Sequence, residues 1–100
     1  MAEIILTATM LLQNDRLLQA ERVRRLPLRL ALLGLLNCCD KNGFFYWRPR
    51  HLKLKIFPYD DIDFEIVLDA LAEHDFIDKH EENGALYGSI KPQTVLANWF

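Results

Sequence analysis

The chain has 100 residues, of which 51% are hydrophobic and 26% are charged. This length suits a single domain with one modest core, and the apolar content argues against an intrinsically disordered chain. No apolar run is long enough to cross a bilayer, and residues 1–10 lack the basic start of a signal peptide. We therefore expect a cytoplasmic protein that makes no contact with a membrane.

The formal net charge of −2 is divided unevenly along the chain. Residues 1–58 carry a net charge of +6, and residues 59–100 carry −8. This asymmetry is consistent with a polar partner surface or with a head-to-tail contact between copies. The alternative is two solvated faces on separate elements.

The first half of the chain predicts two helices after an apolar start. Residues 3–12 are largely apolar without a clear period, which fits a strand or the start of a helix. Asn14 or Asp15 is expected to cap a helix that runs to about Arg24. Pro27 fits the first turn of a second helix over about 27–40, whose leucines cover nearly the whole circumference and mark the centre of the core. Gly34 within it predicts the close approach of a neighbour.

A short strand and two more helices follow. Residues 44–47 (Phe-Phe-Tyr-Trp) strongly favour a strand. Pro49 opens a short helix to about Phe57, which Pro58 ends. Asp60 or Asp61 is expected to cap a longer helix over about 61–75. Its expected buried stripe consists of Ile62, Ile66, Leu68, Leu71 and Ala72.

The last elements predicted are a β-hairpin and a tail. Asn83-Gly84 separates residues 76–82 from 85–90, and this dipeptide tolerates the positive φ angles of a tight turn. Pairing around it places His80 opposite Tyr87. Residues 91–100 are a candidate for a short helix that docks back. The predicted fold is α+β and mostly helical: a winged helix-turn-helix core (26–90) with an N-terminal helical extension (1–25), a two-stranded wing and a tail (91–100).

One stretch of the chain is similar to a known family. Residues 48–63 (RPRHLKLKIFPYDDID) resemble the central motif of the N-terminal winged-helix domains of phage and prophage replication proteins, the replisome organisers. The helix around 68–73, the pair Phe76-Ile77 and the hairpin at 83–87 extend this resemblance over about 26–90. It implies a DNA-binding module associated with replication or its regulation, with a replication or regulatory protein as a possible partner.

The candidate DNA-binding residues are basic. Cations gathered on one face supply most of the non-specific affinity for a phosphate backbone. On a short helix after Pro49, residues 48, 51 and 55 share one face, and the N-terminal arginines are expected nearby. The candidate set is Arg24, Arg25, Arg48, Arg50, His51, Lys53 and Lys55. The alternative is a solvated helix face.

The helix over 61–75 has the opposite charge. Its expected exposed residues are Asp63, Glu65, Asp69 and Glu73, which repel phosphates, so we do not expect this helix to read the major groove. An alternative function is a protein-interaction module in which this acidic helix docks a basic partner without nucleic acid. The aromatic residues 44–47 beside Arg48 are a further candidate for stacking unpaired bases, although at least two of them are expected to belong to the core.

No chemistry beyond binding is predicted. Cys38 and Cys39 are adjacent and are interpreted as buried small apolar residues in a reducing compartment. No zinc-ligand spacing, phosphate loop or nucleophile motif is present, so no enzyme activity, metal or cofactor is expected. The apolar residues 4–12 and Trp99-Phe100 would form an exposed patch, which predicts a homodimer.

Overall fold

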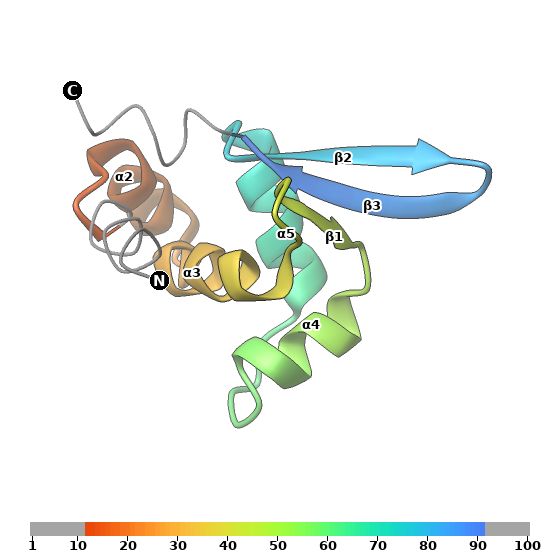
Figure 1. Cartoon of the computed structure of the whole chain (residues 1–100). Helices are drawn as coiled ribbons and strands as arrows, with labels where there is room; N and C mark the ends of the chain where they lie inside the picture. The colour runs from red at the N-terminus through yellow and green to blue at the C-terminus, as the bar shows by residue number, and fades with distance from the viewer. Residues whose placement is uncertain (1–11, 92–100) are drawn as a thin grey trace.

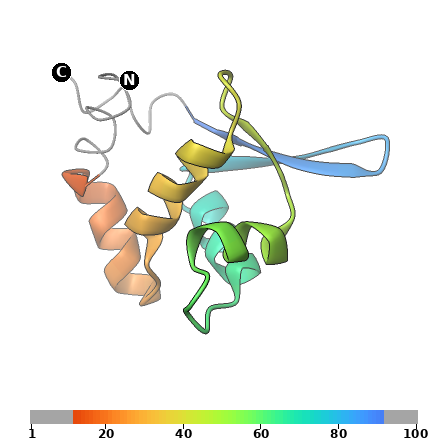
Figure 2. The same cartoon turned by 60° about the horizontal axis from the view of Figure 1, so that its bottom comes forward.

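The computed structural model describes residues 12–91, which form an α+β domain. Within these residues, four helices pack on one side of a three-stranded antiparallel sheet (Figures 1 and 2). The helices are α2 (Asp15–Arg24), α3 (Leu28–Cys38), α4 (Pro49–Ile56) and α5 (Phe64–Glu73), and the strands are β1 (Phe44–Tyr46), β2 (Ile77–Glu82) and β3 (Ala85–Ile90). The predictions for residues 3–11 and 92–100, including the proposed dimer contacts, lie outside the described residues.

The first helix, α2, begins as the sequence predicts. Asn14 is its N-cap, because the Asn14 side-chain oxygen accepts a hydrogen bond from the Leu17 N–H at 3.1 Å. Arg25 ends the helix in the left-handed conformation, with φ of 56°. The Glu21 carboxylate then accepts hydrogen bonds from the backbone N–H of Arg29 at 3.0 Å and from its guanidinium at 3.1 Å. These contacts fix α2 to the start of α3.

The central helix, α3, is contacted by α2, α4 and α5. It ends at Cys38, two residues earlier than predicted, because the Asp40 carboxylate accepts hydrogen bonds from the N–H groups of Asn42 and Phe44, each at 2.9 Å. The prediction that α3 packs on several sides at the centre of the core is confirmed, although Leu30 is 57% exposed. The buried face consists of Leu28, Ala31, Leu32 and Leu35.

Gly34 brings α4 against α3, as the sequence predicts. A Cβ atom built on Gly34 would lie 2.5 Å from Cγ2 and 2.7 Å from Cγ1 of Ile56, the last residue of α4. No side chain fits at this position unless Ile56 moves. Gly34 therefore sets how closely the basic helix α4 approaches the core.

Helix α5 begins later than predicted. Its N-cap is Asp63, whose carboxylate accepts a hydrogen bond from the Glu65 N–H at 3.1 Å, so the prediction of Asp60 or Asp61 is wrong. The predicted buried stripe is wrong at Ile66, which is 53% exposed. The stripe that packs into the core starts from the observed cap and consists of Phe64, Val67, Leu68, Ala70 and Leu71.

The sheet has the order β1-β3-β2, so the last strand within residues 12–91 is the central one. The hairpin prediction is confirmed: Asn83 and Gly84 have φ of 53° and 81°, and His80 pairs with Tyr87. The short strand β1 adds to this hairpin by pairing with β3. Gly88 permits this arrangement, because a Cβ there would lie 2.4 Å from Cζ of Phe45.

The core lies between the inner face of the sheet and the helices. Phe45 and Trp47 point inward and stack with ring centroids 6.1 Å apart, which confirms that two of the four aromatics at 44–47 belong to the core. Phe44 and Tyr46 alternate with them and point outward, as expected for a strand. The buried aromatic and aliphatic side chains are Leu17, Ala20, Leu28, Ala31, Leu32, Leu35, Phe45, Trp47, Leu52, Phe57, Phe64, Val67, Leu68, Ala70, Leu71, Phe76, Ile77 and Ile90.

Candidate nucleic-acid interface

Helix α4 presents a basic face to solvent. Pro49 occupies its first turn, where the missing N–H costs nothing, and Leu52 anchors the helix in the core. With 3.6 residues per turn, the residues opposite Leu52 point outward. The exposed residues are Arg50, His51, Leu54 and Lys55, whereas Lys53 is half-buried. We call these five residues the α4 face.

The cations of α4 have no acidic partners among the described residues. The ion pairs found within residues 12–91 involve Arg24, Arg29 and Lys91, and none involves a side chain of α4. Arg48, just before α4, places its guanidinium 5.2 Å from the centroid of the Tyr46 ring. Because none of these cations is held in a close ion pair, they remain accessible to an anionic partner.

The structure does not place the N-terminal arginines beside α4. Helices α2 and α4 lie on different sides of α3 (Figures 1 and 2). Arg24 forms an ion pair with Glu73, and its Nε–H donates to Nε2 of His74 at 3.2 Å. Arg25 is exposed at the end of α2. The expectation that Arg24 and Arg25 join one patch with the basic helix is therefore not met, because Arg24 is paired with the end of α5 and Arg25 lies at the end of α2.

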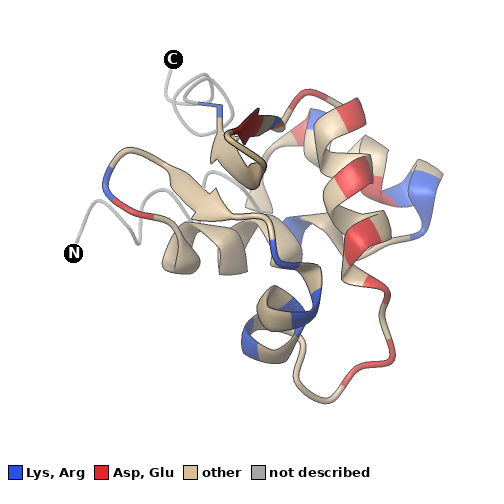
Figure 3. Cartoon of the chain, turned by 90° about the vertical axis from the view of Figure 1, so that its right-hand side faces the viewer, with Lys and Arg blue, Asp and Glu red and all other residues tan. Residues whose placement is uncertain are grey.

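The exposed side of α5 is acidic, as the sequence predicts. Glu65, Asp69 and Glu73 follow one another along the helix at i, i+4 spacing, and all three are exposed. Figure 3 shows these acids as a stripe on α5, separate from the basic residues of α4. The two charges meet at the N-terminus of α5, where a shallow hollow is lined by both Arg50 and Lys53 and by Asp63 and Glu65. The uneven charge of the chain is thus displayed on two neighbouring helices.

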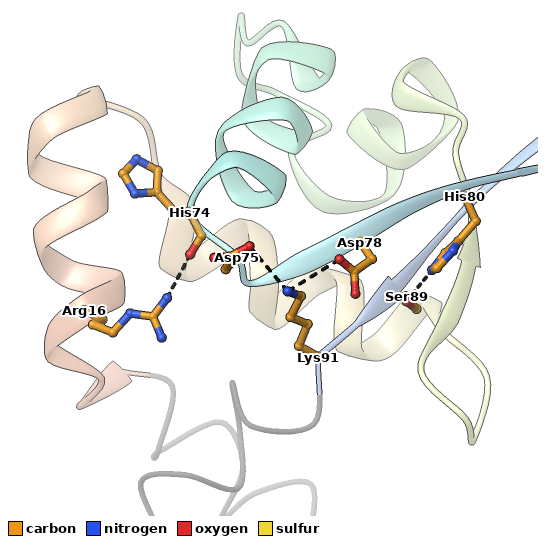
Figure 4. Close-up of polar contacts among 7 residues, drawn as sticks. All are labelled: Arg16, His74, Asp75, Asp78, His80, Ser89 and Lys91. Atoms are coloured by element: carbon orange, nitrogen blue, oxygen red, sulfur yellow. Dashed lines mark hydrogen bonds and ion pairs between the residues drawn. The ribbon is translucent and has the colours of Figure 1, made fainter.

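Other acidic residues are neutralised within the domain. The Lys91 ammonium lies 3.3 Å from a carboxylate oxygen of Asp75 and 3.5 Å from one of Asp78. Figure 4 marks both contacts with dashed lines. The hydrogen bond to Asp75 raises the pKa of Lys91 above its ordinary value. Arg16 also donates to the His74 carbonyl at 2.9 Å, which ties α2 to the end of α5. Some of the acidic residues of 59–100 therefore form ion pairs that stabilise the fold.

Aromatic side chains form an outward surface on the sheet that the sequence indicated only in part. Directly paired residues of an antiparallel sheet point to the same side. Tyr46 pairs with Tyr87, which pairs with His80, and these three residues form one row across all three strands. Phe44 lies in the next row of the same face. Tyr87 of β3 joins this surface only because β1 pairs with β3, and residues 44–47 alone do not indicate this pairing.

Lys79 of β2 was not among the predicted site residues. Its ammonium lies 4.8 Å from the centroid of the Trp47 ring, on the inner side of the sheet. An isolated lysine in a hairpin whose other charges are acidic gives no sequence signal for this contact. Lys79 covers the edge of the buried Phe45–Trp47 stack.

The two cysteines are half-buried thiols rather than fully buried residues. Burial raises the pKa of the Cys39 thiol, which also donates to the Leu36 carbonyl at 3.3 Å.

Across residues 12–91, no cluster of three histidine, cysteine or acidic side chains is placed to hold a metal ion. In the same range, every helix is too short or too polar to span a bilayer.

Comparison with protein-family models, with curated proteins and with solved structures found no significant match to this chain.

Proposed function

We propose that this chain is a winged-helix domain. In winged-helix proteins a three-helix core with a helix-turn-helix is followed by a hairpin wing. The order α3-β1-α4-α5-β2-β3 supports this proposal, as does the insertion of β3 between β1 and β2. In this assignment α4 and α5 are the helix-turn-helix, the β2–β3 hairpin is the wing, and α2 is an N-terminal extension.

We further propose that the domain binds the backbone of DNA through the α4 face. The observation that carries this proposal is the group of cations on and just before α4, which have no acidic partners among the described residues. Phosphate contacts require only such cations and carry no sequence information. The resemblance of residues 48–63 to phage replication proteins supports a role in replication or its regulation.

The proposed contact differs from that of most helix-turn-helix proteins. The second helix of the motif usually enters the major groove, but here α5 exposes Glu65, Asp69 and Glu73. Carboxylates close to phosphates oppose binding. The duplex is therefore expected to run along α4 with α5 turned away from the groove.

A salt titration tests this proposal. Binding of a fluorescent duplex is followed by anisotropy between about 50 and 200 mM salt, with an expected slope in log K of about −0.9 for each phosphate neutralised. In the double variant Arg50→Ala/Lys55→Ala, the slope should become less steep by up to about 1.8, because two cations are lost. Arg22→Ala is the matched control, because Arg22 is an exposed arginine of α2. Absence of duplex binding at low salt, or an equal loss in the control, would contradict the proposal.

A second candidate function is protein association through α5. Ile66 is 53% exposed and borders the stripe of acidic residues that includes Glu65 and Asp69, so α5 exposes an apolar side chain next to negative charge. A basic surface, such as the α4 face of another copy, would complement it. Head-to-tail association of this kind predicts a sedimentation coefficient that falls with added salt and in Ile66→Asp. A monomer at all salt concentrations would exclude this self-association.

A further inference from the structure

The outer face of the sheet carries aromatic rings that the hydrophobic core does not use. Tyr46 is 71% exposed and Phe44 is 42% exposed, both on β1. Tyr87 and His80 continue the same face across β3 and β2. Large aromatic side chains gathered on an exposed sheet are a common feature of surfaces that bind flat ligands by stacking.

Three of these rings, those of Phe44, Tyr87 and His80, contact one another. Tyr87 stacks on His80 with centroids 4.8 Å apart and an interplanar angle of 19°, and the Phe44 ring meets Tyr87 edge-on at 5.7 Å. A hydrogen bond of 2.8 Å between His80 Nε2 and the Ser89 hydroxyl fixes the imidazole (Figure 4). The part of the surface formed by Phe44, Tyr87 and His80 is thus pre-organised, which lowers the entropy cost of binding.

A hollow of about 530 Å³ lies beside this surface. It runs along β1 between β3 and the end of α3, and its volume falls within the range of small-molecule sites. The rings of Phe44, Tyr46 and Tyr87 line it. One carboxylate, that of Asp40, also lines it, but its Oδ1 already accepts two backbone hydrogen bonds. The hollow is therefore suited to a flat, largely apolar group such as a nucleobase.

The charge beside the hollow points to an anionic strand. The Arg48 guanidinium lies over one face of the Tyr46 ring, 5.2 Å from its centroid, and the α4 face follows directly after Arg48 in the chain. On the same sheet face, Asp78 is paired with Lys91, and Glu82 belongs to β2, the edge strand opposite β1. A stacked base at Tyr46 would therefore have a cation at its phosphate and further cations along the strand.

We propose that the outer sheet face binds an unpaired nucleic-acid strand, with one base stacked on Tyr46 and an adjacent phosphate on Arg48. In a duplex the base faces are covered by stacking, so this site selects single strands or opened ends. The proposal rests on the proposed nucleic-acid function and adds to it a site with a different preference from the α4 face.

The experiment measures anisotropy of labelled oligo(dT) and oligo(rU) of about 16 nucleotides, and of a duplex, with the full chain. Tyr46→Ala should weaken single-strand binding about tenfold or more with an unchanged salt slope, because stacking releases no counterions. Tyr46→Phe should bind like the wild type. Arg48→Ala should make the salt slope of single-strand binding less steep by about 0.7. Dependence on Tyr46 with either oligonucleotide supports the proposal.

Tyr59→Ala is the matched control, because Tyr59 is a 97% exposed tyrosine in the turn after α4. Circular dichroism of each variant verifies the fold. Equal single-strand affinity in Tyr46→Ala and the wild type, or an equal loss in Tyr59→Ala, would overturn the proposal. Duplex binding without single-strand binding overturns it and leaves the α4 proposal intact, whereas no binding of either ligand at low salt overturns both. A change in sedimentation alone for Tyr46→Ala would assign the surface to a protein contact instead.

Discussion

Substitution of Gly34 by alanine tests how tightly α4 is held against the core. An alanine Cβ would approach three side-chain atoms of Ile56 to within 2.5–2.9 Å. Two of these atoms, Cγ1 and Cγ2, are attached to the Ile56 Cβ, so they move only if the side chain changes rotamer or α4 shifts. Overpacking of this kind costs about 1–3 kcal/mol, whereas alanine gains about 1 kcal/mol over glycine inside a helix. We expect a net destabilisation of about 1 kcal/mol.

The double variant isolates the contact. Ile56→Ala alone removes half-buried atoms and should cost about 2 kcal/mol, at the lower end of the range for a buried isoleucine. Gly34→Ala/Ile56→Ala should cost about 1 kcal/mol rather than the sum of about 3, because the new methyl group occupies the vacated space and the helix gain remains. Urea unfolding followed by far-ultraviolet circular dichroism gives each value, with m unchanged.

Two results would refute this reasoning. If Gly34→Ala is more stable than the wild type by about 1 kcal/mol, Ile56 rotates away freely and Gly34 does not set the position of α4. If the free-energy change of the double variant equals the sum of the two single changes, the residues at positions 34 and 56 do not interact. A shift of α4 has a second consequence, because the α4 face would move with it. Gly34→Ala should therefore also weaken duplex binding, and Ile56→Ala should restore part of that loss.

Two further predictions follow from local contacts. Asp63→Ala should cost about 1 kcal/mol of unfolding free energy through loss of the hydrogen bond to the Glu65 N–H, whereas Asp61→Ala should stay within about 0.5 kcal/mol; equal effects in urea unfolding would contradict Asp63 as the cap. Because burial raises the pKa of Cys39, less thiolate is present in the folded chain at a given pH. In Cys38→Ala, iodoacetamide should alkylate Cys39 more slowly under native conditions than in denaturant at pH 8, with the native rate rising as the pH approaches the folded pKa. Equal rates would contradict the burial.

The local elements could be predicted because their signals lie close together in the sequence. Pro49 and Pro58 bracket a short helix, and Asn83-Gly84 favours a tight turn, so α4 and the hairpin were placed almost correctly. The cap of α5 could not be chosen in the same way. Asp60, Asp61 and Asp63 are all good capping residues, and the packing of Phe64 and Val67 decides among them. The wrong start also explains why Ile66 was assigned to the core.

The candidate site depended more on long-range contacts. The basic character of α4 is evident from its own residues, but the separation of Arg24 from it depends on an ion pair with Glu73, 49 residues away. The pairing of β1 with β3 is equally remote in sequence. A strand of three residues has no pattern that identifies its partner. The aromatic row from Tyr46 to His80 therefore became evident only in the folded chain.

The central position of β3 has a consequence for the order in which the chain folds during synthesis. Helices α2 to α5 and strand β1 are made before residue 85, but β1 gains its hydrogen-bond partner only when residues 87–89 follow. The Phe45 ring packs over Gly88 of β3, so this contact cannot form before β3 is made. A nascent chain that stops at Asn83 would therefore expose the aromatic half of its core and the edges of two strands. Such a species is prone to aggregation, so the addition of β3 completes the sheet and covers this part of the core.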